Sequence, residues 1–202
     1  MYGNNGTIIN PLNVQYVDDG AIGKAINFNG VNEKGSVQVL QNSSLALNQE
    51  VTVSYWLRMN SHYGEVNDDN NFENEGNHAV FVKGQEGAIS NYIFTSSDTS
   101  ALWYQRNPNE SYSVTNAFNV GDWVHVAFTI SKTQVKGYVN GVQVTQEGLS
   151  VPVDLTTSNT GSLYIGWLNE SWYALDGAVD DFRIYNVALT SDEIQELYQL
   201  AD

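Results

Sequence analysis

Apolar and polar residues alternate along much of this 202-residue chain. In residues 51–58 (VTVSYWLR) the odd positions are apolar or aromatic, and the even positions carry Thr, Ser, Trp and Arg. Residues 123–130 (WVHVAFTI) repeat the pattern, with the apolar row at the even positions. Because successive side chains of a strand point to opposite faces, this period of two predicts strands with one face in a core.

Asn140 and Gly141 separate two further apolar-rich segments, 135–139 and 142–145. Asn-Gly readily supplies the two positive φ angles of a type I′ turn, so these segments are expected to form a hairpin. Other strands are predicted at residues 25–28, 36–39, 79–83, 91–95, 101–105, 112–115, 163–165 and 178–185.

One helix is predicted near the end of the chain. Thr190 and Glu193 form a capping box, in which each side chain accepts a hydrogen bond from the other residue's backbone amide. Ile194, Leu197 and Tyr198 follow at helical spacing, so the helix is expected to seal an edge or a face of the sheets. Many short strands with one late helix predict an all-β fold, an antiparallel two-sheet jelly-roll β-sandwich.

Charge and composition narrow the possible partners. The chain has 8 Lys+Arg against 23 Asp+Glu, a net charge of −15, so neither nucleic acid nor an anionic membrane is an expected partner. It has no cysteine, and no apolar segment is long enough for membrane insertion. The acidic balance favours neutral partners or cations such as calcium, which prefers oxygen ligands.

Seven segments matter for their joint order and spacing: 2–8 (YGNNGTI), 23–30 (GKAINFNG), 51–58, 121–129 (GDWVHVAFT), 138–143 (YVNGVQ), 163–167 (LYIGW) and 175–194 (LDGAVDDFRIYNVALTSDEI). Together they resemble the laminin-G-like jelly-roll modules of the concanavalin A-like lectin and glucanase superfamily. The resemblance implies one domain over residues 1–202, taken from a larger secreted or cell-surface protein, with no signal peptide in this chain. Such modules usually begin with a short edge strand, which is missing here or is replaced by another segment.

Modules of this kind bind sugars, bind proteins or space other domains, and the same sandwich also hosts glycoside hydrolases and polysaccharide lyases. A hydrolase needs two facing carboxylates, whereas Asp180 and Asp181 are adjacent on one predicted strand. A lyase would need a pair such as His125 and Tyr138, which come close if their strands pair. We assign no catalytic residue and do not expect an enzyme.

The resemblance also implies a structural calcium ion. Asp180 is predicted to share a strand face with Ala178, Phe182 and Ile184, which would draw its carboxylate toward the core. A buried carboxylate needs a partner, and either calcium or hydrogen bonds from loop amides would serve. A second cation in the acidic segment 64–77 is an alternative to a solvated loop. The implied calcium ligands are Asp180, Asn29, Gly30 and Asn10.

Sugar recognition needs aromatic planes and amides, and the chain has 24 aromatic and 24 Asn residues. The outward rows of segments 51–58 and 123–130 carry Trp56, Trp123 and His125, which either form a polar, aromatic sheet face or pack beneath the helix. The candidate ligand-binding residues are Trp172, Tyr173, Trp103, Arg106, Trp167, Asn169, His125 and Tyr138.

The function predicted from these observations is non-catalytic binding of a polysaccharide or glycan by a calcium-stabilised extracellular domain. The alternative is a calcium-dependent adhesion domain that binds a protein, including other domains of its parent chain. A polysaccharide lyase or glycoside hydrolase is the third interpretation.

Overall fold

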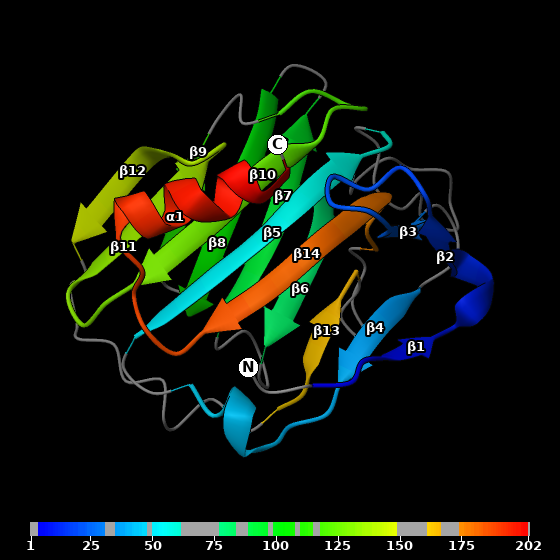
Figure 1. The fold of residues 1–202 in the computed structure, drawn as a ribbon, viewed down its shortest axis with the longest axis horizontal. Helices are drawn as coiled ribbons and strands as arrows, with labels where there is room; N and C mark the ends of the chain where they lie inside the picture. Colours follow the sequence, from blue (N-terminus) through cyan, green and yellow to red (C-terminus); the bar gives the residue numbers. More distant parts are fainter. Residues whose placement is uncertain are drawn as a thin grey trace.

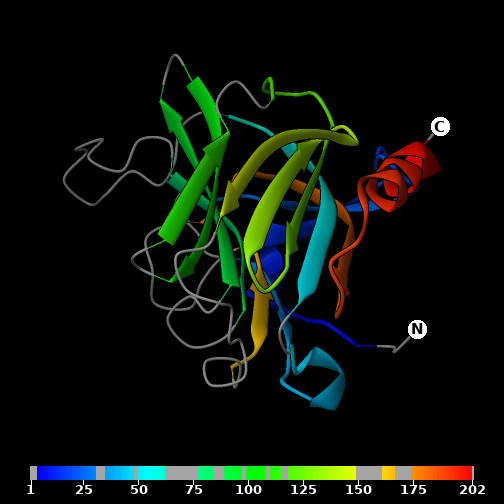
Figure 2. The same ribbon diagram turned by 90° about the vertical axis from the view of Figure 1, so that its left-hand side faces the viewer.

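The computed structural model describes residues 4–30, 35–47, 50–61, 77–83, 89–96, 99–107, 110–114, 118–148, 161–166 and 174–201. Side chains are described for these except at 77, 89–96, 99–107, 110–114 and 146–148. Two seven-stranded antiparallel sheets pack face to face, with one helix outside the sandwich (Figures 1 and 2). The predicted two-sheet jelly-roll class is therefore confirmed.

The two sheets interleave segments from the whole chain, as a jelly roll requires. Sheet A has the order β1 (Thr7–Ile9), β4 (Ser36–Val39), β13 (Leu163–Ile165), β6 (Asn77–Lys83), β7 (Ile89–Ser96), β8 (Thr99–Asn107) and β9 (Glu110–Val114). Sheet B has the order β12 (Val142–Gly148), β11 (Gln134–Val139), β10 (Val124–Ile130), β5 (Val51–Met59), β14 (Gly177–Tyr185), β3 (Ala25–Phe28) and β2 (Val14–Val17).

The strands predicted from alternation are all present, whereas two short ones were missed. These are β1 and β2, which lie at the edges of the two sheets and are joined by a 3₁₀ helix, Pro11–Asn13. Strands of three and four residues are too short to show a period of two. β1 pairs with β4 and so occupies the edge beside that strand.

The core lies between the sheets and is built from the predicted apolar rows. The odd positions of β5, from Val51 to Leu57, are at most 1% exposed. Tyr55 contacts the rings of Phe81 from sheet A and Phe182 from β14, at centroid distances of 6.0 and 5.8 Å. The edge-to-face Tyr55–Phe81 contact joins the two sheets, whereas the stacked Tyr55–Phe182 contact lies within sheet B. Both geometries are favourable for ring pairs.

Helix α1 (Ser191–Tyr198) packs on the outer face of sheet B, over β10 and β11 (Figure 1; Figure 2 shows it outside the sandwich). Its apolar stripe buries Ile194 completely, against Ala127 of β10 and Tyr138 of β11. Tyr198, at the end of the helix, stacks on Trp56 with ring centroids 5.6 Å apart. No helix in the described ranges is long and apolar enough to cross a membrane.

The capping box predicted at the start of this helix is present, and its removal is a testable loss. Glu193 N donates to Thr190 Oγ1 at 3.3 Å, and Thr190 N donates to the Glu193 carboxylate at 2.7 Å. Thr190→Ala removes the hydroxyl that accepts from the Glu193 amide and keeps the bond from its own backbone amide. It is expected to cost about 1 kcal/mol of unfolding free energy, measured by urea denaturation. Thr190→Ser keeps the hydroxyl and is the control, so equal losses in both variants would contradict the prediction.

One prediction about β14 is wrong, and a β-bulge explains why. Asp180 pairs with Trp56 and Arg183 with Ser54, so β14 advances three residues while β5 advances two. Asp181 takes the extra position, with a left-handed φ of 45°. The bulge turns Phe182 and Ile184 toward the core and leaves Asp180 on the outer face, not on a shared core face.

Candidate functional site

The outer face of sheet B is divided into a covered half and an open half. α1 covers the half that carries His125 and Tyr138, each only 1% exposed. The interpretation of these two residues as ligand contacts on an open polar face is therefore wrong. The packed alternative is the one observed, because the apolar stripe of α1 needs this face to bury itself.

The covered histidine is held by neighbours from β5 and α1. His125 Nε2 lies 2.9 Å from Ser54 Oγ, and the ring packs against Trp56 and Tyr198. Burial lowers the pKa of His125 to about 4, and the positive charge of Arg183 adds to the shift. The imidazole is consequently neutral at pH 7 and inaccessible to a polymer, so the lyase interpretation loses its candidate pair.

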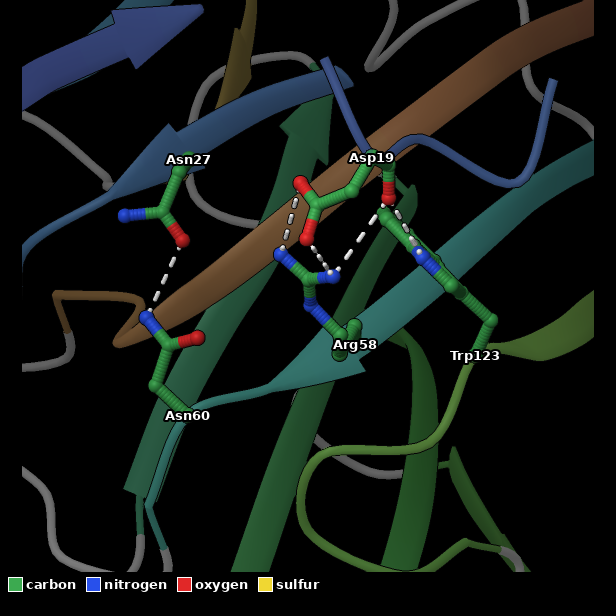
Figure 3. Close-up of polar contacts among 5 residues, drawn as sticks. All are labelled: Asp19, Asn27, Arg58, Asn60 and Trp123. Atoms are coloured by element: carbon green, nitrogen blue, oxygen red, sulfur yellow. Dashed lines mark hydrogen bonds and ion pairs between the residues drawn. The ribbon is translucent and has the colours of Figure 1, made fainter. Parts of the chain in front are cut away.

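The open half of the same face carries a group of exposed and half-buried polar residues around the ends of β3 and β5. Asn27, Ala178 and Arg58 lie opposite one another on three neighbouring strands, so a small alanine separates two polar side chains. Figure 3 shows the group, which we call the polar cluster; its members are Asp19, Asn27, Arg58, Asn60 and Trp123.

Arg58 is fixed by an acid on one side and an aromatic ring on the other. Its Nη1 donates to Asp19 Oδ2 at 2.7 Å, and its Cζ lies 4.9 Å from the Trp123 ring centroid. Trp123 Nε1 donates to the backbone carbonyl of Asp19 at 3.0 Å. The hydrogen bond from Arg58 lowers the pKa of Asp19, so this exposed carboxylate stays ionised at neutral pH.

The two asparagines of the cluster are linked to each other and to the start of β14. Asn60 Nδ2 donates to Asn27 Oδ1 at 3.0 Å and to Asp176 Oδ1 at 3.1 Å. Within the described part of the chain, the side-chain amide nitrogen of Asn27 and the side-chain oxygen of Asn60 make no hydrogen bond (Figure 3). One donor and one acceptor therefore remain for a ligand on the solvent side.

Sequence reasoning missed most of this cluster. Arg58 and Trp123 were recognised only as members of outward rows, and Asp19, Asn27 and Asn60 were not singled out. The outward position of Asn27 follows from the alternation in residues 25–28, but its proximity to Arg58 depends on which strands pair. A loop acid such as Asp19 leaves no periodic signal at all.

The other predicted ligand-binding residues are placed only in part. Trp103 and Arg106 lie on β8 of sheet A, where Trp103 pairs with Tyr92 of β7 and Ser113 of β9. Their side chains are outside the described ones. Trp167, Asn169, Trp172 and Tyr173 lie outside the described residues. Their role as an aromatic binding site stays a prediction, and it concerns a different part of the chain from the polar cluster.

The structure separates Asp180 from Asn29 and Gly30, two of the other calcium ligands implied by the family resemblance. Asp180 contacts the loop around Ile22, whereas Phe28, next to Asn29 and Gly30, pairs with Gly177. Three residues of strand separate the two places, roughly 10 Å. Asn10 occupies the N-cap position of the 3₁₀ helix before β2, without a side-chain capping bond. The described residues contain no group of three or more acidic or histidine side chains able to hold a metal ion.

A family model described as the concanavalin A-like lectin/glucanases superfamily matches residues 31–195. This chain belongs to that superfamily. The resemblance recognised in the sequence is thereby confirmed.

Curated relatives and solved structures show where this superfamily fold recurs. The chain is 25% identical to human usherin over 134 residues and 23% identical to mouse usherin over 157 residues, which is 62% and 74% of the chain but 3% of either relative. Domain 4 of AbnA, an extracellular arabinanase of Geobacillus stearothermophilus solved with arabinotriose, is 24% identical with a TM-score of 0.66, covering 98% of this chain and 88% of that one. The binding domain of Paraclostridial Mosquitocidal Protein 1 is 19% identical with a TM-score of 0.70, covering 97% and 48%.

Proposed function

We propose that this domain binds a glycan without catalysing its cleavage, and that the polar cluster is part of the binding surface. The observation that carries the proposal is the open half of sheet B, where a fixed Arg58–Asp19 pair lies near an unused amide donor and acceptor of Asn27 and Asn60. The neighbouring half is sealed by α1, so this half is the part of the outer face that a ligand can reach.

The chemistry of the cluster suits vicinal hydroxyl groups. A hydroxyl both donates and accepts, and a carboxylate beside amides and a guanidinium offers the matching acceptors and donors. Because Asp19 and Trp123 already hold Arg58 in place, binding costs little side-chain entropy. The side chain of Trp123 is half-buried and adds apolar surface beside the polar groups.

The comparisons support the proposal at the level of the fold. Domain 4 of the arabinanase was solved with arabinotriose, and the entry of botulinum neurotoxin type C into cells depends on two ganglioside molecules. By analogy with these neighbours, we propose that this chain also binds a carbohydrate. We further propose that it does so outside the cell, as a domain of a larger protein. An adhesion domain that binds a protein is the alternative outcome of the test below.

The proposal is tested by affinity electrophoresis and a glycan array, followed by titration calorimetry on the best ligand. Arg58→Gln and Asn27→Ala each remove one side of the cluster and are expected to weaken binding at least about tenfold, since each loses one or more hydrogen bonds to the ligand or to Asp19. Lys132→Ala is the control, because Lys132 is exposed in the turn after β10, at the opposite end of that strand from Trp123.

Two further results discriminate between binding sites and between functions. Trp172→Ala tests the aromatic site predicted from sequence: a loss in that variant, with none in Arg58→Gln, would move the glycan away from the polar cluster. If no glycan retards the protein in electrophoresis and the protein releases soluble products from a polysaccharide, the domain is an enzyme and the binding proposal is wrong.

A further inference from the structure

We propose that Asp180 is the positioning residue of the ligand surface: its carboxylate anchors the loop of residues 18–24 through the backbone amide of Ile22, without a cation, and so holds Asp19 against Arg58. This inference rests on the proposed function for the role of Asp19. The anchor itself is a matter of protein geometry and is measurable without a ligand.

Both oxygens of the Asp180 carboxylate are engaged by main-chain donors. Ile22 N donates to Oδ2 at 2.7 Å, and Asp181 N donates to Oδ1 at 2.7 Å. Hydrogen bonds to a charged acceptor are shorter and stronger than neutral ones, and these two distances are in that range. Asp180 is 8% exposed, so the bonds are shielded from water.

The loop approaches the carboxylate closely because it contains glycine where a side chain would collide. A Cβ at Gly20 would lie 2.7 Å from Asp180 Oδ2 and 2.9 Å from the Gly23 carbonyl. Gly20 N donates to that same carbonyl at 3.1 Å, which closes the loop into a turn. The loop is therefore fitted to Asp180 at Gly20 and at Ile22.

The anchored turn is directly connected to the ligand surface. Asp19 precedes Gly20, and its backbone carbonyl accepts the Trp123 indole bond while its carboxylate accepts Arg58. If the turn moves, both contacts to Asp19 move with it. The anchor at Asp180 thus fixes the position of the one acidic group in the polar cluster.

The bulge at Asp181 makes a cation unnecessary at this point. It places Asp180 on the outer face, under the loop, and it presents the Asp181 amide to the carboxylate. Asp181 itself is taken by Arg183, with Oδ1 2.8 Å from Nε. Both Asp180 oxygens are used, and Asn29 and Gly30 lie beside another part of β14. The amides of Ile22 and Asp181 therefore supply the positive partner that calcium supplies in the family expectation.

The experiment compares Asp180→Asn with Asp181→Asn in the full domain. Asn at position 180 keeps one acceptor oxygen and loses the charge, whereas Asn at position 181 tolerates the left-handed backbone and loses only the Arg183 pair. We expect Asp180→Asn to shift the Ile22 amide and Arg58 side-chain NMR signals upfield and to raise the Kd for the selected glycan about fivefold or more. Asp181→Asn leaves the Ile22 signal in place.

Calcium chloride and EDTA form the second arm. Wild-type melting temperature and the Ile22 signal are expected to be the same in both, because the anchor uses amides. Stabilisation by calcium that disappears in Asp180→Asn would overturn the proposal, and so would an Ile22 signal unchanged in Asp180→Asn. A domain that binds no glycan but shows the Ile22 and Arg58 shifts would refute the proposed function while leaving the anchor standing.

Discussion

Acidification from pH 7 to pH 4 is expected to cost the domain about 2–3 kcal/mol of unfolding free energy through His125 alone. The folded-state pKa of about 4 lies below the ordinary value of 6.5, because burial disfavours the imidazolium and Arg183 repels it. Between these two values the unfolded chain binds a proton that the folded domain does not. Stability from this residue is therefore complete above pH 6.5 and is lost as pH falls toward 4.

Urea denaturation across this pH range measures the effect, with His125→Gln as the control. Glutamine keeps a polar group for the Ser54 hydroxyl and cannot titrate. The pH dependence of the unfolding free energy of this variant therefore retains only the contributions of the carboxylates and of the other histidines. The difference in unfolding free energy between the wild type and His125→Gln should narrow by about 2–3 kcal/mol from pH 7 to pH 4. Parallel curves would show that His125 does not titrate beneath α1.

Raising the pH from 7.5 to 10.5 is expected to stabilise the folded state by about 2 kcal/mol through Lys83. This lysine is 0% exposed, and its Nζ donates to Gln41 Oε1 and to the Gly161 carbonyl, each at 2.7 Å. Burial lowers its pKa from 10.5 to about 8. Above pH 8 the folded form releases a proton that the unfolded form still holds, so stability rises with pH.

Lys83→Met removes the titrating group while keeping the apolar stem, so it isolates this contribution from those of tyrosines and exposed lysines. The wild type should gain stability relative to Lys83→Met between pH 7.5 and 10.5, as measured by chemical denaturation at each pH. A constant difference would mean that the Lys83 ammonium is stabilised by its two acceptors at every pH in the range.

The strands, the core rows and the helix could be predicted because each is specified by residues close in sequence. The alternation from Val51 to Leu57 gave the core face, and Thr190 with Glu193 gave the helix start. The family resemblance then supplied the sheet arrangement.

The use of the outer face could not be predicted in the same way. Whether His125 lies open or covered depends on where α1 packs, and that contact joins segments more than 60 residues apart in sequence. Likewise, Asp19 meets Arg58 only because β2, β3, β14 and β5 stand side by side in sheet B. The alternation of residues along one strand indicates which side chains share a face. It does not indicate which other part of the chain covers that face.

The bulge in β14 has a consequence for comparing this chain with its relatives. Side chains of a strand alternate between the two faces, and the extra residue Asp181 reverses this alternation. Before Asp181 the odd-numbered residues face the core, and after it the even-numbered residues do. An alignment that places the one-residue gap elsewhere in 177–185 would assign the side chains between that gap and Asp181 to the wrong face. All side chains of the strand are assigned to the correct face only when the gap falls at Asp181.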